Sequence, residues 1–179
     1  MNYIDLVILA GGKGSRIKNV NKNKPKPLAN IGRYSFLDLL LGNLCKYHFR
    51  KIFILAGYKG KQIYKKYHNE NINFINIECL IEKKPLGTGG GLKKIKNKLS
   101  NNFFVINGDT IADFNFYEML KFKKKNNCVI AITKSKFAVN GNKIRNLQID
   151  QKKMIKINNS KKVKNYKSAG VCLFDKKIF

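Results

Sequence analysis

A glycine-rich loop that directly follows an apolar run near the start of the chain is the feature that most constrains the fold. The apolar run covers residues 6–10, and the loop reads Gly11-Gly12-Lys13-Gly14-Ser15-Arg16. Glycines allow backbone N–H groups to approach a polyphosphate closely, and the basic side chains of the loop add positive charge. The spacing differs from both the P-loop and the G-x-G-x-x-G pattern, so the segment predicts a strand followed by a phosphate-binding loop of another kind. The candidate nucleotide-binding residues of this segment are Leu9, Ala10, Gly11, Gly12, Lys13, Gly14 and Ser15.

Apolar runs of strand length alternate with segments of helical period over most of the chain. This alternation is typical of an α/β fold, Rossmann-like, with a mostly parallel sheet and helices on both faces. After residue 135 the pattern shortens, which predicts a small antiparallel excursion at 143–149 and 154–158 before a further strand at 166–174. The other expected strands are 6–10, 51–56, 74–79, 103–107 and 128–133, and the expected helices are 36–47, 59–68, 88–99 and 116–124.

The length and the cysteine pattern favour one domain in a reducing compartment. A chain of 179 residues with 44% hydrophobic residues can bury one ordinary core, so we expect a single domain over 1–179. No apolar stretch approaches the roughly 18 residues of a membrane span, and residues 1–10 lack the features of a signal peptide, which predicts a cytoplasmic protein. The cysteines are far apart, so we expect free thiols instead of a disulfide framework or a zinc site. They are Cys45, Cys79, Cys128 and Cys172.

The strong positive charge leaves a nucleic-acid-binding protein open as a remote alternative. The chain has 37 Lys and Arg against 10 Asp and Glu, a net charge of +27, and such an excess attracts phosphate backbones. Lysines are spread along the whole chain beside abundant Asn and Ile, which is typical of a compositional bias of the genome. Base-edge recognition favours Arg over Lys, so we expect no nucleic-acid partner. The arginines are Arg16, Arg33, Arg50 and Arg145.

A second element, Pro25-Lys26-Pro27, holds one lysine in a restrained backbone. A proline on each side favours an extended backbone and limits the direction of the lysine side chain. In isolation, a basic surface loop marked by proline is the alternative interpretation. The element lies ten residues after Arg16, and this position favours a functional pairing with the glycine-rich loop.

Two further elements follow expected strands, at the edge where ligands bind in open parallel sheets. The first is Glu82-Lys83-Lys84-Pro85-Leu86-Gly87-Thr88-Gly89, for which a turn and a helix capped by Thr88 are the alternative interpretation. The second is Gly108-Asp109, whose carboxylate either caps the following segment or serves an ion. With ten acidic residues in the whole chain, a carboxylate at this edge favours the ion.

Together the four elements resemble the sugar-phosphate nucleotidyltransferase family. The hallmark of that family is G-G-x-G-[ST]-R followed by P-K-P, which residues 11–16 and 25–27 match. The family's P-L-G-T-[AG]-G and G-D elements are matched by residues 85–90 and 108–109. Within the family the chain is most similar to the bacterial heptose 1-phosphate guanylyltransferases. Glucose-1-phosphate cytidylyltransferases and mannose-1-phosphate guanylyltransferases are close alternatives.

The resemblance implies a reaction that joins an NTP to a heptose or hexose 1-phosphate, giving an NDP-sugar and pyrophosphate for surface polysaccharide synthesis. It implies that Arg16 and Lys26 are the catalytic cations and that Asp109 binds the cofactor Mg²⁺. A carboxylate can accept hydrogen bonds from both N1–H and the amino group of guanine, so Glu82 favours GTP. The nucleotide contacts implied by the base-binding element are Glu82, Pro85, Gly87, Thr88 and Gly89.

The sugar side of the resemblance departs from the family pattern in two places. The family's F-x-E-K element is replaced by Ile157-Asn158-Asn159-Ser160-Lys161, so we expect the sugar phosphate to meet Gly108 and Lys161, with Lys162 as an alternative cation. Family members continue beyond the strand matched by 169–174, and that continuation carries a second metal-binding Asp. We therefore expect the C-terminal part of the family domain to be missing. The alternative function is a catalytically impaired, nucleotide-binding remnant of the family.

Overall fold

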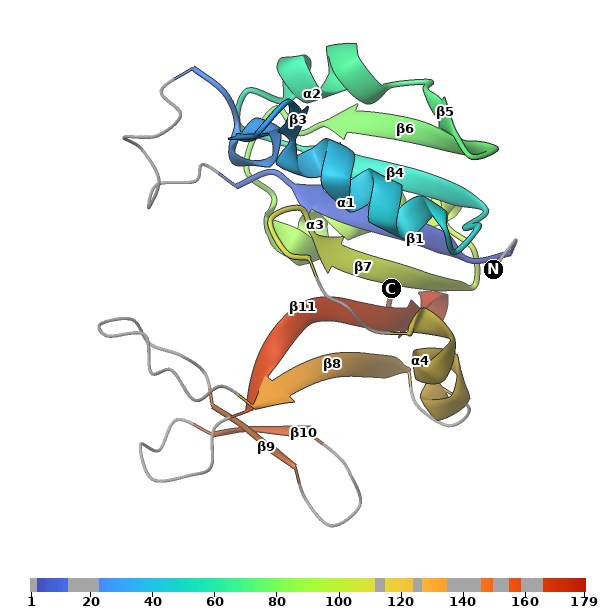
Figure 1. The fold of residues 1–179 in the computed structure, drawn as a ribbon. Helices are drawn as coiled ribbons and strands as arrows, with labels where there is room; N and C mark the ends of the chain where they lie inside the picture. The colour runs from blue at the N-terminus through green and yellow to red at the C-terminus, as the bar shows by residue number, and fades with distance from the viewer. Residues whose placement is uncertain are drawn as a thin grey trace.

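Parallel strands form the centre of the sheet in a computed structural model, which describes residues 3–12, 23–111, 115–123, 127–134, 146–149, 155–158 and 166–179. Within these residues the main sheet has nine strands (Figure 1). Its central order is β7-β1-β4-β6, and all three pairings are parallel, as the sequence predicts. The four strands are β1 (Asp5–Ala10), β4 (Lys51–Ala56), β6 (Ile75–Ile81) and β7 (Asn102–Asn107).

Antiparallel strands flank this parallel centre. β11 (Tyr166–Asp175) lies between β7 and β8 (Cys128–Lys134) and is antiparallel to both. The antiparallel excursion predicted after residue 135 is confirmed, because β9 (Asn146–Ile149) and β10 (Ile155–Asn158) pair antiparallel. The short β5 (Asn71–Ile72) pairs antiparallel with β6 at the other edge. β8 therefore has the direction of the parallel strands but is separated from them by β11.

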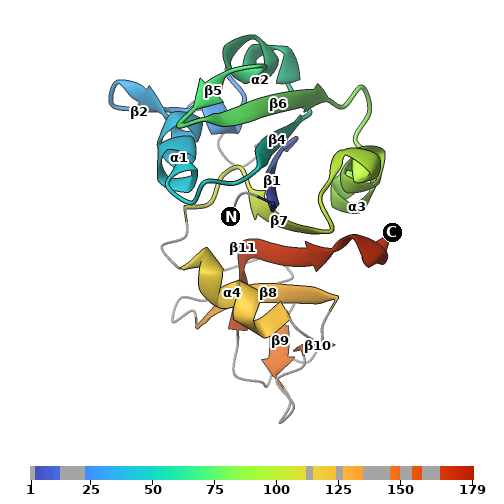
Figure 2. The ribbon, with the colours of Figure 1, turned by 90° about the vertical axis from the view of Figure 1, so that its right-hand side faces the viewer.

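Helices cover both faces of the sheet, which confirms the predicted α/β class (Figure 2). α1 (Phe36–Cys45), α2 (Gly60–Tyr67) and α4 (Phe116–Phe122) pack on one face, where their apolar residues join Leu6 and Ile8 of β1 in the larger core cluster. α3 (Gly87–Lys94) packs on the opposite face, in the cluster that contains Val7. Successive residues of a strand point to opposite faces, so the apolar run of β1 at residues 6–10 is the expected sequence of a strand covered on both sides.

The short elements were absent from the sequence prediction. They are a hairpin of β2 (Asn30–Ile31) and β3 (Tyr34–Ser35), strand β5, and 3₁₀ helices at Lys26–Leu28 (η2), Lys96–Lys98 (η3) and Lys176–Ile178 (η5). The helix predicted over 88–99 ends at Lys94 and is followed by η3, because Ile95 leaves helical geometry at φ −107° and ψ 7°. No helix in the described ranges combines the length and the apolar character that a membrane crossing requires.

A carboxylate at the start of α1 links this helix to α2. Ser35 and Asp38 form a capping box, in which each side chain accepts a hydrogen bond from the other's backbone N–H. Asp38 also accepts hydrogen bonds from Lys66 at 2.7 Å and from Tyr67 at 2.8 Å. Burial alone would raise the pKa of Asp38, but the hydrogen bonds from Lys66, Ser35 and Tyr67 lower it to about 2. The network ties the N-terminus of α1 to the C-terminal turn of α2.

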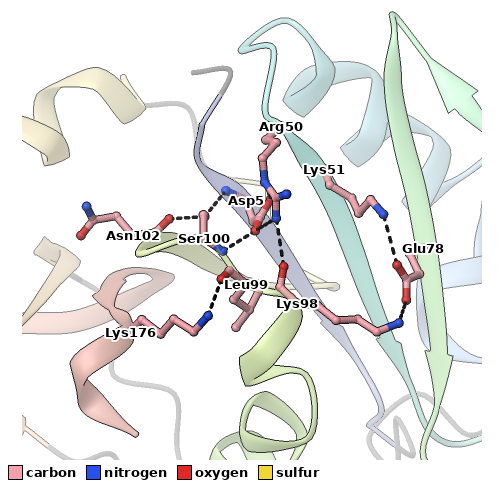
Figure 3. A network of polar contacts seen from close by, with 9 residues as sticks. All are labelled: Asp5, Arg50, Lys51, Glu78, Lys98, Leu99, Ser100, Asn102 and Lys176. Carbon is pink, nitrogen blue, oxygen red and sulfur yellow. Dashed lines mark hydrogen bonds and ion pairs between the residues drawn. The ribbon is translucent and has the colours of Figure 1, made fainter.

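A second, fully buried carboxylate organises the amino-terminal edge of the sheet (Figure 3). Asp5, the first residue of β1, is 0% exposed and accepts hydrogen bonds from Arg50 Nε at 2.8 Å and Nη2 at 2.6 Å. It also accepts from the Ser100 backbone N–H at 2.7 Å, and Arg50 donates a further bond to the Lys98 carbonyl. The hydrogen bonds from Arg50 to Asp5 raise the pKa of Arg50. This cluster holds the starts of β1, β4 and β7 together.

Replacement of Arg50 by methionine is expected to destabilise the fold strongly. The change leaves the carboxylate of Asp5 buried without its bidentate partner, and breaking a buried pair in this way costs about 3 kcal/mol or more. Urea unfolding of the variant measures this cost. Arg33→Met is the matched control, because Arg33 lies on the surface hairpin over the Tyr34 ring, and its loss should cost less than about 1 kcal/mol. Equal losses in the two variants would contradict the role assigned to Arg50.

Candidate functional site

One cavity of about 540 Å³ opens at the carboxyl edge of the parallel strands. Residues from the ends of β1, β6 and β7 and from η2 line it, as expected for an open α/β sheet, in which ligands bind beyond the carboxyl ends of the strands. The structure brings together most of the residues that the sequence predicts for a site. Those that line the cavity are Leu9, Ala10, Gly11, Gly12, Lys26, Glu82, Pro85, Gly87, Thr88, Gly108 and Asp109.

The remaining predicted residues divide into two groups. Gly89 lies in the first turn of α3 but is absent from the cavity lining. The others lie outside the residues that the structure describes, so their roles remain predictions from the sequence. They are Lys13, Gly14, Ser15, Arg16 and Lys161.

Backbone contacts between neighbouring strand ends shape the floor of the cavity. The Gly108 N–H donates to the Leu9 carbonyl at 2.8 Å, and the Tyr58 N–H donates to the Gly11 carbonyl at 3.3 Å. A Cβ atom on Gly57 would lie 2.6 Å from the Gly11 carbonyl oxygen, and one on Gly108 would lie 2.9 Å from the Leu9 carbonyl oxygen. Gly57 therefore allows the turn after β4 to approach Gly11 closely, and Gly108 allows the turn after β7 to approach the end of β1.

Lys26 faces the cavity and forms an ion pair with Asp109. Its backbone belongs to η2, which is held by the extended Pro25 at φ −67° and ψ 151° and by the buried Pro27 and Leu28. Lys26 Nζ donates to Asp109 Oδ2, and the two side chains are 35% and 41% exposed. The Lys26 side chain thus reaches Asp109 at the end of β7. The extended backbone expected at this lysine is wrong, because Pro25 is extended but Lys26 begins a 3₁₀ turn.

Glu82 is wedged between the glycine-rich loop and α3. A Cβ on Gly91 would lie 2.5 Å from Glu82 Oε1, and one on Gly11 would lie 3.3 Å from Oε2. Its backbone N–H donates to the Ala56 carbonyl at 2.8 Å. The hydrogen bond fixes the backbone of Glu82, and packing against Gly11 and Gly91 fixes its side chain. The missing side chains of Gly11 and Gly91 provide the space that the Glu82 carboxylate occupies.

The alternative interpretation of Thr88 as the cap of the helix is wrong. α3 begins at Gly87, its N-cap is Leu86, and no side chain caps it. Gly87 has a positive φ of 68°, a conformation that glycine adopts without the cost borne by other residues. The N-cap of α4 is Asn115, which accepts from the Tyr117 N–H at 2.9 Å, so Asp109 does not cap that helix.

Several residues of the site were missed by the sequence reasoning. Pro27, Leu55 and Asn107 line the cavity, and Gly57 and Gly91 provide close approaches beneath it. A usable signal was present for two of them. Asn107 is the last residue of a buried strand and Gly57 directly follows one, the positions at which parallel strands present side chains and turns to a ligand. Leu55 and Gly91 give no comparable signal, because packing alone brings them there.

These features define a class, the α/β proteins with a ligand cavity at the carboxyl edge of a parallel sheet. The model of the nucleotidyl transferase family matches residues 6–141, and the chain belongs to this family.

Two enzymes are among the relatives of the chain. D-glycero-alpha-D-manno-heptose 1-phosphate guanylyltransferase of Campylobacter jejuni is 36% identical over 123 residues, which are 69% of this chain and 55% of that protein. Mannose-1-phosphate guanylyltransferase of Mycobacterium tuberculosis is 28% identical over 132 residues, which are 73% of this chain and 37% of that protein. The chain spans about half the length of the heptose 1-phosphate guanylyltransferases that it matches.

A solved structure confirms the fold. HddC from Yersinia pseudotuberculosis, complexed with GMP-PN, superposes with a TM-score of 0.80 at 27% sequence identity. The superposition covers 98% of this chain and 78% of that one. The inositol-1-phosphate CTP transferase of T. maritima shares the fold alone, with a TM-score of 0.74 at 17% identity.

Replacement of Gly57 by alanine is expected to disturb the floor of the cavity. The new Cβ would lie 2.6 Å from the Gly11 carbonyl oxygen and 2.9 Å from the Gly11 Cα, and backbone atoms cannot rotate away as a side chain can. Such overpacking costs about 1–3 kcal/mol, which urea unfolding measures. Gly42→Ala is the control, because its Cβ meets nothing within 4 Å in α1 and alanine stabilises a helix interior by up to about 1 kcal/mol. Unchanged stability in Gly57→Ala would contradict the close approach.

Proposed function

We propose that this chain transfers a nucleotidyl group from an NTP, preferentially GTP, to a heptose or hexose 1-phosphate for surface polysaccharide synthesis. The observation that carries the proposal is one cavity lined by Gly11, Gly12, Lys26, Glu82 and Asp109 in a member of the nucleotidyl transferase family. Two relatives, a heptose 1-phosphate guanylyltransferase and a mannose-1-phosphate guanylyltransferase, support the substrate classes. All four cysteines are free, which supports the reducing cytoplasm as the location.

The proposed reaction is a direct displacement at phosphorus. An oxygen of the sugar phosphate forms a bond to the α-phosphorus of the NTP, the bond to the bridging oxygen breaks, and pyrophosphate leaves with that electron pair. Such a reaction needs positioning and charge neutralisation and no covalent intermediate on the protein. Lys26, which the structure directs into the cavity, would hold the α-phosphate and the incoming phosphate. Arg16 would stabilise the pyrophosphate, a role that rests on the sequence resemblance.

The glycine-rich loop and the Glu82 segment would bind the two ends of the nucleotide. Gly11 and Gly12 line the cavity beside β1, where backbone N–H groups can bind phosphate oxygens. Glu82 and Thr88 line it beside α3, and the wedged carboxylate of Glu82 would accept hydrogen bonds from N1–H and the amino group of guanine. The sugar phosphate would lie beside Gly108, with Lys161 as a further cation.

Asp109 is the carboxylate that would hold Mg²⁺. It lies in the cavity lining at the end of β7 and is partly exposed, and oxygen ligands of this kind fit Mg²⁺. Within the described residues no three His, Cys, Asp or Glu side chains gather around a metal-sized space. One carboxylate with phosphate oxygens as the other ligands is the arrangement Mg²⁺ commonly uses in phosphoryl-transfer sites. When bound, the ion would neutralise charge on the phosphates.

A pyrophosphate-release assay tests the proposed reaction. The chain is incubated with Mg²⁺, one NTP at a time, and heptose, mannose or glucose 1-phosphate, and we expect release with GTP and at least one sugar phosphate. Lys26→Ala should lower the rate by about 100-fold, because one charge-stabilising group of the transition state is lost. Lys24→Ala is the control, since Lys24 bonds to Asn30 on the surface. GTP binding without pyrophosphate release from any pair would overturn the transferase and favour the nucleotide-binding remnant.

Glu82→Gln is expected to reduce the preference for GTP over CTP. The amide keeps the size of the side chain but loses the charge that pairs with both guanine donors, a change of about tenfold or more in relative affinity. Calorimetric titration with each nucleotide measures the ratio. Glu118→Gln makes the same chemical change on the surface of α4, where Glu118 pairs with Lys121, and should leave the ratio unaltered. An unchanged ratio in Glu82→Gln would remove guanine recognition from this residue.

A further inference from the structure

The ion pair between Lys26 and Asp109 joins the two groups of the cavity to which the proposed function assigns different ligands. Lys26 is assigned to phosphate and Asp109 to the cation, yet Lys26 Nζ donates directly to Asp109 Oδ2 in this structure. A carboxylate oxygen and a phosphate oxygen accept hydrogen bonds from an ammonium in the same way. The Asp109 carboxylate therefore takes one of the three N–H donors of Lys26 and neutralises the charge that a substrate phosphate needs.

The backbones on both sides of this pair are fixed, so the pair can separate only through side-chain rotation. η2 is closed by hydrogen bonds from the Leu28 N–H to the Pro25 carbonyl at 2.8 Å and from the Ala29 N–H to the Lys26 carbonyl at 3.0 Å. On the other side, the Gly108 N–H bonds to the Leu9 carbonyl at 2.8 Å. The long lysine side chain is the flexible partner, and its movement needs no rearrangement of the sheet.

The choice of Asp109 as the partner is specific within the cavity. Among the described residues that line the cavity, Glu82 and Asp109 carry the carboxylates. Glu82 is held between Gly11 and Gly91, while Asp109 pairs with Lys26. Both members of the pair are more than a third exposed, and ion pairs of that kind are weak. Its separation is therefore within the reach of a polyphosphate ligand.

We propose that the Asp109 carboxylate competes with the substrate phosphates for Lys26, an inference that rests on the proposed function. This carboxylate takes the ammonium that an incoming polyphosphate requires, and binding exchanges one anion for another on Lys26. A cation taken up by Asp109 favours the exchange, because the carboxylate then no longer needs the lysine. Affinity for the phosphate chain and affinity for the cation are thereby coupled through one pair of side chains.

The test is the binding of tripolyphosphate and of GTP in buffer containing EDTA, measured by calorimetry. Asp109→Asn keeps the shape of the side chain but releases Lys26, and it should tighten binding of both probes by about two- to fivefold, the change in affinity that corresponds to an exposed ion pair. The same substitution in a Lys26→Met background should give no gain, because the released group is absent there. Glu118→Gln removes one negative charge from a similar surface pair with Lys121 and should leave binding unchanged.

The results distinguish competition for Lys26 from a simple loss of repulsion between Asp109 and the phosphates. They also distinguish a failure of this inference from a failure of the proposed function. A gain that persists in the Lys26→Met background would show a simple loss of repulsion and overturn the inference, as would unchanged or weaker binding in Asp109→Asn. If the unsubstituted chain binds GTP with Mg²⁺ but shows no dependence on Asp109 in EDTA, the inference fails and the proposed function stands. If Asp109→Asn tightens tripolyphosphate binding while no NTP yields pyrophosphate, the inference stands and the transferase fails. Absence of binding in every variant overturns both.

Discussion

The parallel pairing of β1 with β4 and β7 is the constraint on which the rest of the structure depends. Because the three strands run in one direction and in register, with Leu9 opposite both Leu55 and Asn107, their turns all emerge at one edge. The close approaches of Gly57 to Gly11 and of Gly108 to Leu9 are possible only in that register. A cavity lined by segments from residue 9 to residue 109 follows from this pairing, since no local interaction could bring those segments together.

The two ends of the sheet use carboxylates in different ways. At the amino-terminal edge Asp5 is fully buried and both of its carboxylate oxygens accept hydrogen bonds, from Arg50 and Ser100. It therefore holds the starts of neighbouring strands together. At the carboxyl edge Asp109 is partly exposed, and its Oδ2 accepts from a flexible partner, Lys26, while its Oδ1 accepts from the neighbouring Thr110 at 3.5 Å. A fully buried carboxylate loses its partner only at a large desolvation cost, whereas a pair whose two members are both partly exposed separates at small cost. The difference in exposure therefore distinguishes the structural carboxylate from the one that can exchange its partner.

Most of the fold could be predicted because its long elements have clear periodicity. The apolar runs at β1, β4 and β7 and the helical segments at α1 and α2 were predicted to within a few residues of the observed bounds. The two-residue strands β2, β3 and β5 were not predicted, since such short pairings leave no periodic pattern and depend on tertiary packing. The placement of β11 between β7 and β8 could not be predicted either, because strand order is a non-local property.

The candidate site, like the fold, could be predicted only in part from the sequence. By itself the sequence determined which chemical groups are available: a glycine-rich loop after a strand, a lysine between two prolines, and the residues Glu82 and Asp109 after later strands. Their residue types and their place after strands were enough to predict a shared edge. Only the tertiary structure decided that Lys26 pairs with Asp109, 83 residues away, and that Glu82 fits between Gly11 and Gly91. Contacts of this kind depend on distances between atoms of different strands and helices, and those distances are set by packing and register.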